Sequence, residues 1–100
     1  MLTSPMPLQT FLDDLYQTLA TKRGGDPETS YTARLLASGT PKIAQKVGEE
    51  GLEVALAAVQ QDKAATIYEL ADLFYHIMVL CLNQGIHPDD IVAELQRRST

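Results

Sequence analysis

Five acidic residues fall into two groups whose spacing could bind a metal ion. Glu49, Glu50 and Glu53 form the first group, and Glu69 and Asp72 form the second. Glu50 with Glu53, and Glu69 with Asp72, lie three positions apart, so on helices each pair presents two carboxylates on one face. Carboxylate oxygens suit Mg²⁺ or Mn²⁺, whose remaining positions are filled by water and substrate phosphates. The sequence therefore predicts a metal site formed by Glu50, Glu53, Glu69 and Asp72, serving a phosphate-bearing substrate.

The elements that must position these groups are two long helices. Thr40-Pro41, a capping hydroxyl followed by a first-turn proline, predicts a helix that runs to about residue 60. Asp62 can cap a further helix over about residues 63–84, which Gly85 would end. Because the turn between them is tight, we expect the two helices to be antiparallel neighbours.

The second long helix carries a thin polar stripe on a surface that is otherwise apolar nearly all round. Glu69, Asp72 and His76 form that stripe. Such a helix is normally buried, and buried carboxylates are costly unless they are paired or bound to metal. Asp62 lies nine residues after Glu53 and seven before Glu69. At about 1.5 Å rise per residue, the two acidic groups should therefore lie at similar heights.

The rest of the chain also has the pattern of helices. Ser4 and Pro5 predict the start of a first helix, whose apolar residues recur at helical spacing as far as Leu19. Ser30 can cap a short helix over 31–38, and the Pro-Asp-Asp at 88–90 can open a last one. No segment alternates with a period of two. We expect an all-α bundle of about five helices within a single domain spanning residues 1–100.

Two other interpretations of the acidic residues stand beside the metal site. Glu49 and Glu50 with Lys46 could be a solvated helix face with ordinary ion pairs. A di-iron or di-manganese bundle would need two Glu-x-x-His pairs, and the sequence has no such pair. His76 is more typical of a core or supporting histidine than of a magnesium ligand.

Composition limits the classes of function. The net charge is −5 and no run of Lys or Arg exceeds two, which argues against binding to duplex nucleic acid. Cys81, the one cysteine, lies in an apolar run and is interpreted as a small buried hydrophobe in a reducing compartment. The N-terminus lacks the pattern of a signal peptide, and residues 67–82 contain too many polar groups for a membrane span. We expect a cytoplasmic protein.

The acidic groups also resemble a known pattern. EEGLE at 49–53 followed by ELAD at 69–72 resembles the E-E-x-x-E … E-x-x-D motif of the MazG-like all-α NTP pyrophosphatases. SYT at 30–32, Gly39, KIAQKVGEE at 42–50 and ELADLFYH at 69–76 are more specific. Together they resemble the phosphoribosyl-ATP pyrophosphatase family of histidine biosynthesis, over about residues 8 to 98. Gly51 departs from the alanine more usual there, which costs roughly 1 kcal/mol of helix stability and removes no chemistry.

The resemblance implies a reaction, a cofactor and an assembly. The reaction is Mg²⁺-dependent hydrolysis of phosphoribosyl-ATP to phosphoribosyl-AMP and pyrophosphate. The metal would be held by the matching acids, here Glu50, Glu53, Glu69 and Asp72, with Mn²⁺ as a possible substitute. The protein is expected to be a homodimer or a higher homo-oligomer.

Other side chains fit hydrolysis of a phosphoanhydride. A carboxylate that is not fully committed to metal can accept a proton from the attacking water, and Glu49 and Glu53 are both candidates. Lys42 and Lys46, one turn apart, can hold the pyrophosphate. The residues that could reach phosphate or ribose are Arg34, Ser30 and Tyr31. Arg97 and Arg98 are interpreted as complementing the dipole at the end of the last helix.

Two rival functions remain open at the level of sequence. A house-cleaning pyrophosphatase for (d)NTPs would share the acidic residues but not the specificity for a phosphoribosyl group. A non-catalytic helical module could use its acidic stripe to bind a basic partner. The sequence also leaves open the number of metal ions, the choice between dimer and tetramer, and the grip on the second ribose.

Overall fold

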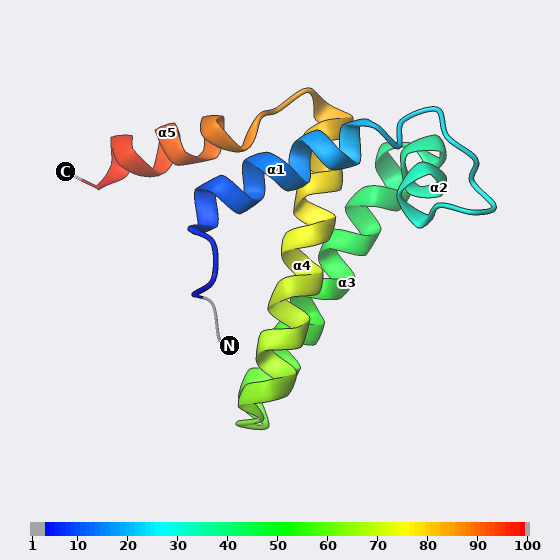
Figure 1. Cartoon of the computed structure of the whole chain (residues 1–100). Helices are drawn as coiled ribbons and strands as arrows, with labels where there is room; N and C mark the ends of the chain where they lie inside the picture. The colour runs from blue at the N-terminus through cyan, green and yellow to red at the C-terminus, as the bar shows by residue number, and fades with distance from the viewer. Residues whose placement is uncertain (1–3, 100) are drawn as a thin grey trace.

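The computed structural model describes residues 4–99, which contain five α-helices and no strand (Figure 1). The helices are α1 (Leu8–Ala20), α2 (Tyr31–Ser38), α3 (Thr40–Val59), α4 (Lys63–Gln84) and α5 (Pro88–Arg98). The predicted all-α class, with two long antiparallel helices, is confirmed.

The α3–α4 hairpin is the frame of the molecule. The two helices lie side by side along their length, and α1, α2 and α5 gather around the open end of the hairpin (Figure 1). α1 packs on α4 and also contacts α5, whereas α2 packs on both α3 and α4. The closed end of the hairpin projects beyond the other helices.

Three predicted helix boundaries are confirmed by their local geometry. The Asp62 carboxylate accepts a hydrogen bond from the Ala65 amide at 3.0 Å, which caps α4. The Ser30 hydroxyl caps α2 in the same way, accepting from the Ala33 amide at 3.1 Å. Gly85 ends α4 in the left-handed conformation, with φ of 70°, which costs glycine little.

The predicted start of the first helix at Ser4 and Pro5 is wrong. α1 begins at Leu8, and its N-cap is Pro7. A proline disfavours helical backbone in the residue before it, so Pro7 prevents the helix from extending back through Met6.

The predicted cap of the third helix is also wrong, since Gly39 rather than Thr40 occupies the N-cap of α3. The Thr40 hydroxyl instead donates to the Asn83 side-chain oxygen at 3.0 Å, which ties the start of α3 to the end of α4. The cap of α5 was not predicted: it is the His87 ring, which accepts from the Asp89 amide at 3.0 Å.

The hydrophobic core lies where α1 and α2 cover the open end of the hairpin. Its buried side chains are Leu19, Leu35, Ile43, Met78, Val79, Cys81 and Leu82. Cys81 is 4% exposed, so its interpretation as a buried hydrophobe is confirmed. α4 supplies most of this core. By length and mean hydropathy α4 could also cross a membrane, but the core helix of a soluble protein meets the same criteria.

The expected burial of α4 on all sides is wrong for the single chain. Ile67 and Tyr68 on α4 are 59% and 70% exposed, and Leu56 and Val59 on α3 are 49% and 81% exposed. These residues lie toward the closed end of the hairpin, which no other described helix covers. We call Leu56, Val59, Ile67 and Tyr68 the hairpin tip.

Candidate functional site

A buried carboxylate cluster lies on the seam between α3 and α4. One oxygen of Glu50, one oxygen of Asp72 and one ring nitrogen of His76 all lie within 4.8 Å of one another. Glu50 comes from α3, and the other two come from α4. Glu50 and His76 are buried, at 8% and 3% exposed, and Asp72 is partly buried. The hairpin therefore brings one predicted metal ligand from each helix together, with Glu50 buried and Asp72 partly open to solvent.

The electrostatics of this cluster favour a cation. Burial, followed by the charge of Asp72, raises the pKa of the Glu50 carboxyl above its usual range. Lys46 is the one lysine or arginine of residues 4–99 that pairs with Glu50, at 3.8 Å. It lies closer to Glu49, at 3.3 Å, and their hydrogen bond raises the pKa of Lys46. Because Lys46 is shared with Glu49, it offsets only part of the negative charge of the neighbouring Glu50 and Asp72 carboxylates.

His76 has both ring nitrogens engaged within the chain. Its Nδ1 lies 2.8 Å from the main-chain oxygen of Asp72, and its Nε2 lies 2.9 Å from the Tyr31 hydroxyl. A carbonyl oxygen only accepts, so Nδ1 carries the proton of the neutral ring and Nε2 accepts from Tyr31. His76 thus links α2 to the carboxylate cluster.

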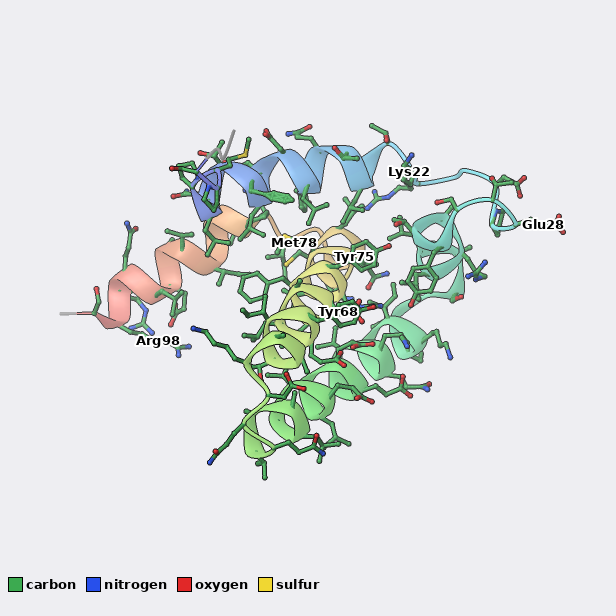
Figure 2. The ribbon with its side chains drawn as sticks, turned by 60° about the horizontal axis from the view of Figure 1, so that its bottom comes forward. Lys22, Glu28, Tyr68, Tyr75, Met78 and Arg98 are labelled. Carbon is green, nitrogen blue, oxygen red and sulfur yellow. The ribbon has the colours of Figure 1, made fainter. Side chains whose placement is uncertain are left out.

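Aromatic packing holds the α2 side of the site. The Tyr31 ring stacks on Tyr75 with centroids 6.1 Å apart, and the Tyr75 hydroxyl is hydrogen-bonded to Thr32. Figure 2 shows Tyr68, Tyr75 and Met78 along α4, with Tyr75 between α4 and α2. Sequence reasoning missed these bonds, because they join residues more than forty positions apart.

The other predicted acids lie outside this cluster. Glu53 and Glu69 are each one turn closer to the closed end of the hairpin; Glu53 is exposed and Glu69 is partly buried. Their role as metal ligands stays a prediction. Glu49 lies on the solvent side, where hydrogen bonds from Gln45 at 2.9 Å and from Lys46 lower its pKa.

The predicted substrate-binding residues are found in different settings. Lys42 is exposed, one turn before Lys46. Ser30 serves as the cap of α2, and Tyr31 is bonded to His76. Arg34 donates to the main-chain oxygen of Pro27 at 3.1 Å, and its guanidinium carbon lies 5.3 Å from the centre of the Tyr31 ring. Arg34 and Tyr31 therefore form one edge of the site.

A second group with metal-ligand chemistry lies between α1 and α5. Ligand atoms of Asp13, His87 and Asp89 also lie within 4.8 Å of one another. Unlike the first group, it contains no buried residue, and His87 Nδ1 already caps α5. The seam between α3 and α4 is therefore the stronger candidate site.

Comparison with known proteins identifies the family. Residues 12–99 match the family model described as phosphoribosyl-ATP pyrophosphohydrolase. The chain belongs to this family. The resemblance carried by the acidic motifs and by the segments around them is thus confirmed.

Relatives within the family include both short and long proteins. The chain is 54% identical over 92 residues to the histidine biosynthesis bifunctional protein HisIE of Photobacterium profundum, covering 92% of this chain and 44% of that protein. It is 53% identical over 87 residues to the phosphoribosyl-ATP pyrophosphatase of Azospirillum brasilense, covering 87% and 78%. With the Escherichia coli HisIE it shares 51% over 88 residues, covering 88% and 43%. The chain thus spans less than half the length of the bifunctional relatives.

Replacing the clustered carboxylates tests whether they form a metal site. We expect Glu50→Gln and Asp72→Asn to weaken Mg²⁺ binding by more than about tenfold, since even supporting residues of metal sites cost that much. Without metal, Glu50→Gln should raise the melting temperature, because a buried charge beside another carboxylate is removed. Calorimetric titration and thermal unfolding in EDTA measure the two effects.

The matched control for this test is Glu28→Gln, which changes an exposed acid in the loop before α2. It should leave both quantities unchanged. Unaltered Mg²⁺ binding in the two cluster variants would show that the metal lies elsewhere.

Proposed function

We propose that this chain hydrolyses phosphoribosyl-ATP to phosphoribosyl-AMP and pyrophosphate in histidine biosynthesis, in the cytoplasm. The observation that carries the proposal is the approach of the buried Glu50 and the partly buried Asp72 on the α3–α4 seam, in a chain that belongs to this family. The Azospirillum brasilense relative named for this activity, which the chain covers over most of its length, supports the substrate. The lone buried cysteine fits a reducing compartment.

The donor set fits a hard dication such as Mg²⁺, with Mn²⁺ as a substitute. Glu50 and Asp72 offer oxygen ligands, and their closeness, which together with burial raises the pKa of Glu50, is a cost that a bound cation would offset. Glu53 and Glu69, one turn along each helix, are the acids that would extend the site toward the substrate. Bound Mg²⁺ would neutralise charge on the phosphoryl oxygens.

The lysines on α3 provide the fixed positive charge beside the carboxylates. Lys46 is held by Glu49 and Glu50, with its side chain 25% exposed, so the ammonium group can reach a phosphate at the edge of the site. Lys42, one turn earlier and exposed, extends this charge along the helix. We assign the pyrophosphate portion of the substrate to this edge.

Glu53 is the better candidate for accepting a proton from the attacking water. The two oxygens of Glu49 are engaged with Gln45 and Lys46, and these hydrogen bonds lower its pKa, which weakens it as a base. Within residues 4–99 the Glu53 carboxylate makes no hydrogen bond or ion pair, so it is free to orient water.

The substrate assignment is tested by measuring pyrophosphate release from phosphoribosyl-ATP and from common dNTPs side by side. We expect Mg²⁺-dependent release that is at least about a hundredfold faster with phosphoribosyl-ATP, a difference of about 3 kcal/mol in transition-state binding. EDTA should abolish it, and added Mg²⁺ should restore it.

Three other outcomes separate the rivals. Equal rates on all substrates would favour a house-cleaning pyrophosphatase. Pyrophosphate release that continues in EDTA would contradict the proposed dependence on a metal ion. No release from any nucleotide would favour a helical module that binds a basic partner.

We further propose that the chain forms a homodimer or a higher homo-oligomer through the hairpin tip. Leu56, Val59, Ile67 and Tyr68 together expose apolar surface at the projecting end of the hairpin. A small domain hides only part of its apolar surface by itself, and an exposed cluster of this kind marks an interaction site. The antiparallel hairpins of two copies could pack as four helices.

The assembly is tested by light scattering coupled to size-exclusion chromatography. We expect the native chain to elute as a dimer or larger, and Leu56→Lys to shift it toward monomer, because a charge would be placed within an apolar contact. Gln17→Lys, on the exposed side of α1, is the control and should not change the mass. A monomeric native chain would contradict the proposal.

A further inference from the structure

A shallow cleft opens on α4 beside the carboxylate cluster. It has a volume of about 260 Å³ and is lined by Tyr68, Ala71, Asp72 and Tyr75. We call this cleft, defined by its four lining residues, the aromatic cleft. Its surface is mostly apolar, yet it includes Asp72, one of the two acids that approach each other on the α3–α4 seam. The aromatic cleft therefore adjoins the proposed metal site directly.

The four lining residues share one side of α4. Positions 71, 72 and 75 follow position 68 by three, four and seven residues, which is the spacing of a single helix face. Tyr68 and Tyr75 are thus two turns apart, about 10 Å along the helix axis (Figure 2). Ala71 lies between them, and its single methyl group leaves the gap open. Tyr75 is held by its hydrogen bond to Thr32 and its stack on Tyr31, whereas Tyr68 is exposed, so the cleft has one fixed wall and one open wall.

The chemistry of the aromatic cleft suits a flat, uncharged ring. Aromatic side chains stack with any nucleobase, because every base has a π face. The four lining residues include no lysine or arginine, so nothing in the lining binds a phosphate group directly. At about 260 Å³ the cleft is smaller than the roughly 300–1,000 Å³ of sites that take a whole ligand, so it accommodates one part of a ligand.

The two sides of the seam offer different groups to a nucleotide. On the α3 side, Lys46 lies 3.8 Å from Glu50, and Lys42 lies one turn before it. On the α4 side, Asp72 opens into the aromatic cleft. The two carboxylates that would hold Mg²⁺ therefore lie between the lysines and the tyrosines. A substrate with its phosphoanhydride at the carboxylates and its pyrophosphate at the lysines would direct its nucleoside toward the cleft.

We propose that the aromatic cleft is the subsite for the purine base of the substrate, with the base stacked on the Tyr68 ring. This inference rests on the proposed function and adds the position of the base to it. Tyr68 makes binding contacts only and takes no part in the reaction at the phosphoanhydride. Because Tyr68 also belongs to the hairpin tip, the cleft adjoins the surface proposed to meet a second copy.

NMR of the tyrosine rings tests the contact directly. The probes are AMP and, as the matched control without a base, ribose 5-phosphate, each added to the native chain with Mg²⁺. The chain has four tyrosines, and the signal lost in Tyr68→Phe assigns Tyr68. We expect AMP to shift the Tyr68 ring signals and to give nuclear Overhauser contacts between ring and base protons, because stacked rings lie in contact. Ribose 5-phosphate should leave the Tyr68 signals in place.

Steady-state kinetics provide the second measurement. Tyr68→Ala should raise the KM for phosphoribosyl-ATP about tenfold and keep kcat within about twofold, since a stacking contact is lost from substrate and transition state alike. Tyr68→Phe keeps the ring and should keep the native KM. Ile67→Ala is the matched control, because Ile67 also lies in the hairpin tip but outside the cleft, and it should show the native KM.

The outcomes separate this inference from the proposed function. If the native chain releases pyrophosphate but AMP leaves the Tyr68 ring unshifted, this inference alone is overturned. An equal shift with ribose 5-phosphate also overturns it, because the contact would then belong to the sugar or the phosphate. An equal rise in KM in Ile67→Ala and Tyr68→Ala contradicts it too, since the effect would belong to the hairpin tip. If the native chain releases no pyrophosphate from phosphoribosyl-ATP, the proposed function fails and the inference fails with it.

Discussion

The approach of the Glu50 and Asp72 carboxylates across the α3–α4 seam is the constraint around which the structure is organised. A buried carboxylate beside a second one is costly in an apolar protein, and a single shared lysine offsets only part of that cost. The hairpin must therefore hold the Glu50 and Asp72 carboxylates close together even when no cation is bound. The Asp62 cap at the closed end and the Thr40–Asn83 hydrogen bond at the open end hold the two helices in register.

The remaining helices support this seam. α2 brings the Tyr31 hydroxyl to His76, and His76 in turn fixes the main chain at Asp72. α1 covers the open end of the hairpin and closes the hydrophobic core. Nothing among the described residues covers the hairpin tip, so one chain supports the site from one end only. A second copy on the hairpin tip would complete that support from the other end.

Much of the fold could be predicted because its determinants are local. Ser30, Asp62 and Gly85 act on backbone within a few residues of themselves, so their types alone indicate the helix ends. The approach of Glu50 to Asp72 could also be predicted, because the tight turn near Asp62 and the fixed rise per residue determine which positions of α3 and α4 face each other. The first helix was misplaced because Pro7, rather than Pro5, sets its start.

What could not be predicted depends on contacts between distant parts of the chain. The Tyr31–His76 bond spans 45 positions and requires the angle at which α2 docks on the hairpin. The exposure of Ile67 and Tyr68 could not be read from the apolar pattern of α4, because such a pattern does not say whether the covering surface comes from the same chain.

The most direct test of the account is where a paramagnetic ion binds. Substoichiometric Mn²⁺ should first broaden the backbone amide signals around Glu50 on α3 and Asp72 on α4, and leave those near the end of α5 sharp. Broadening centred instead on Asp13, His87 and Asp89 would contradict the account, because the metal would then occupy the group between α1 and α5.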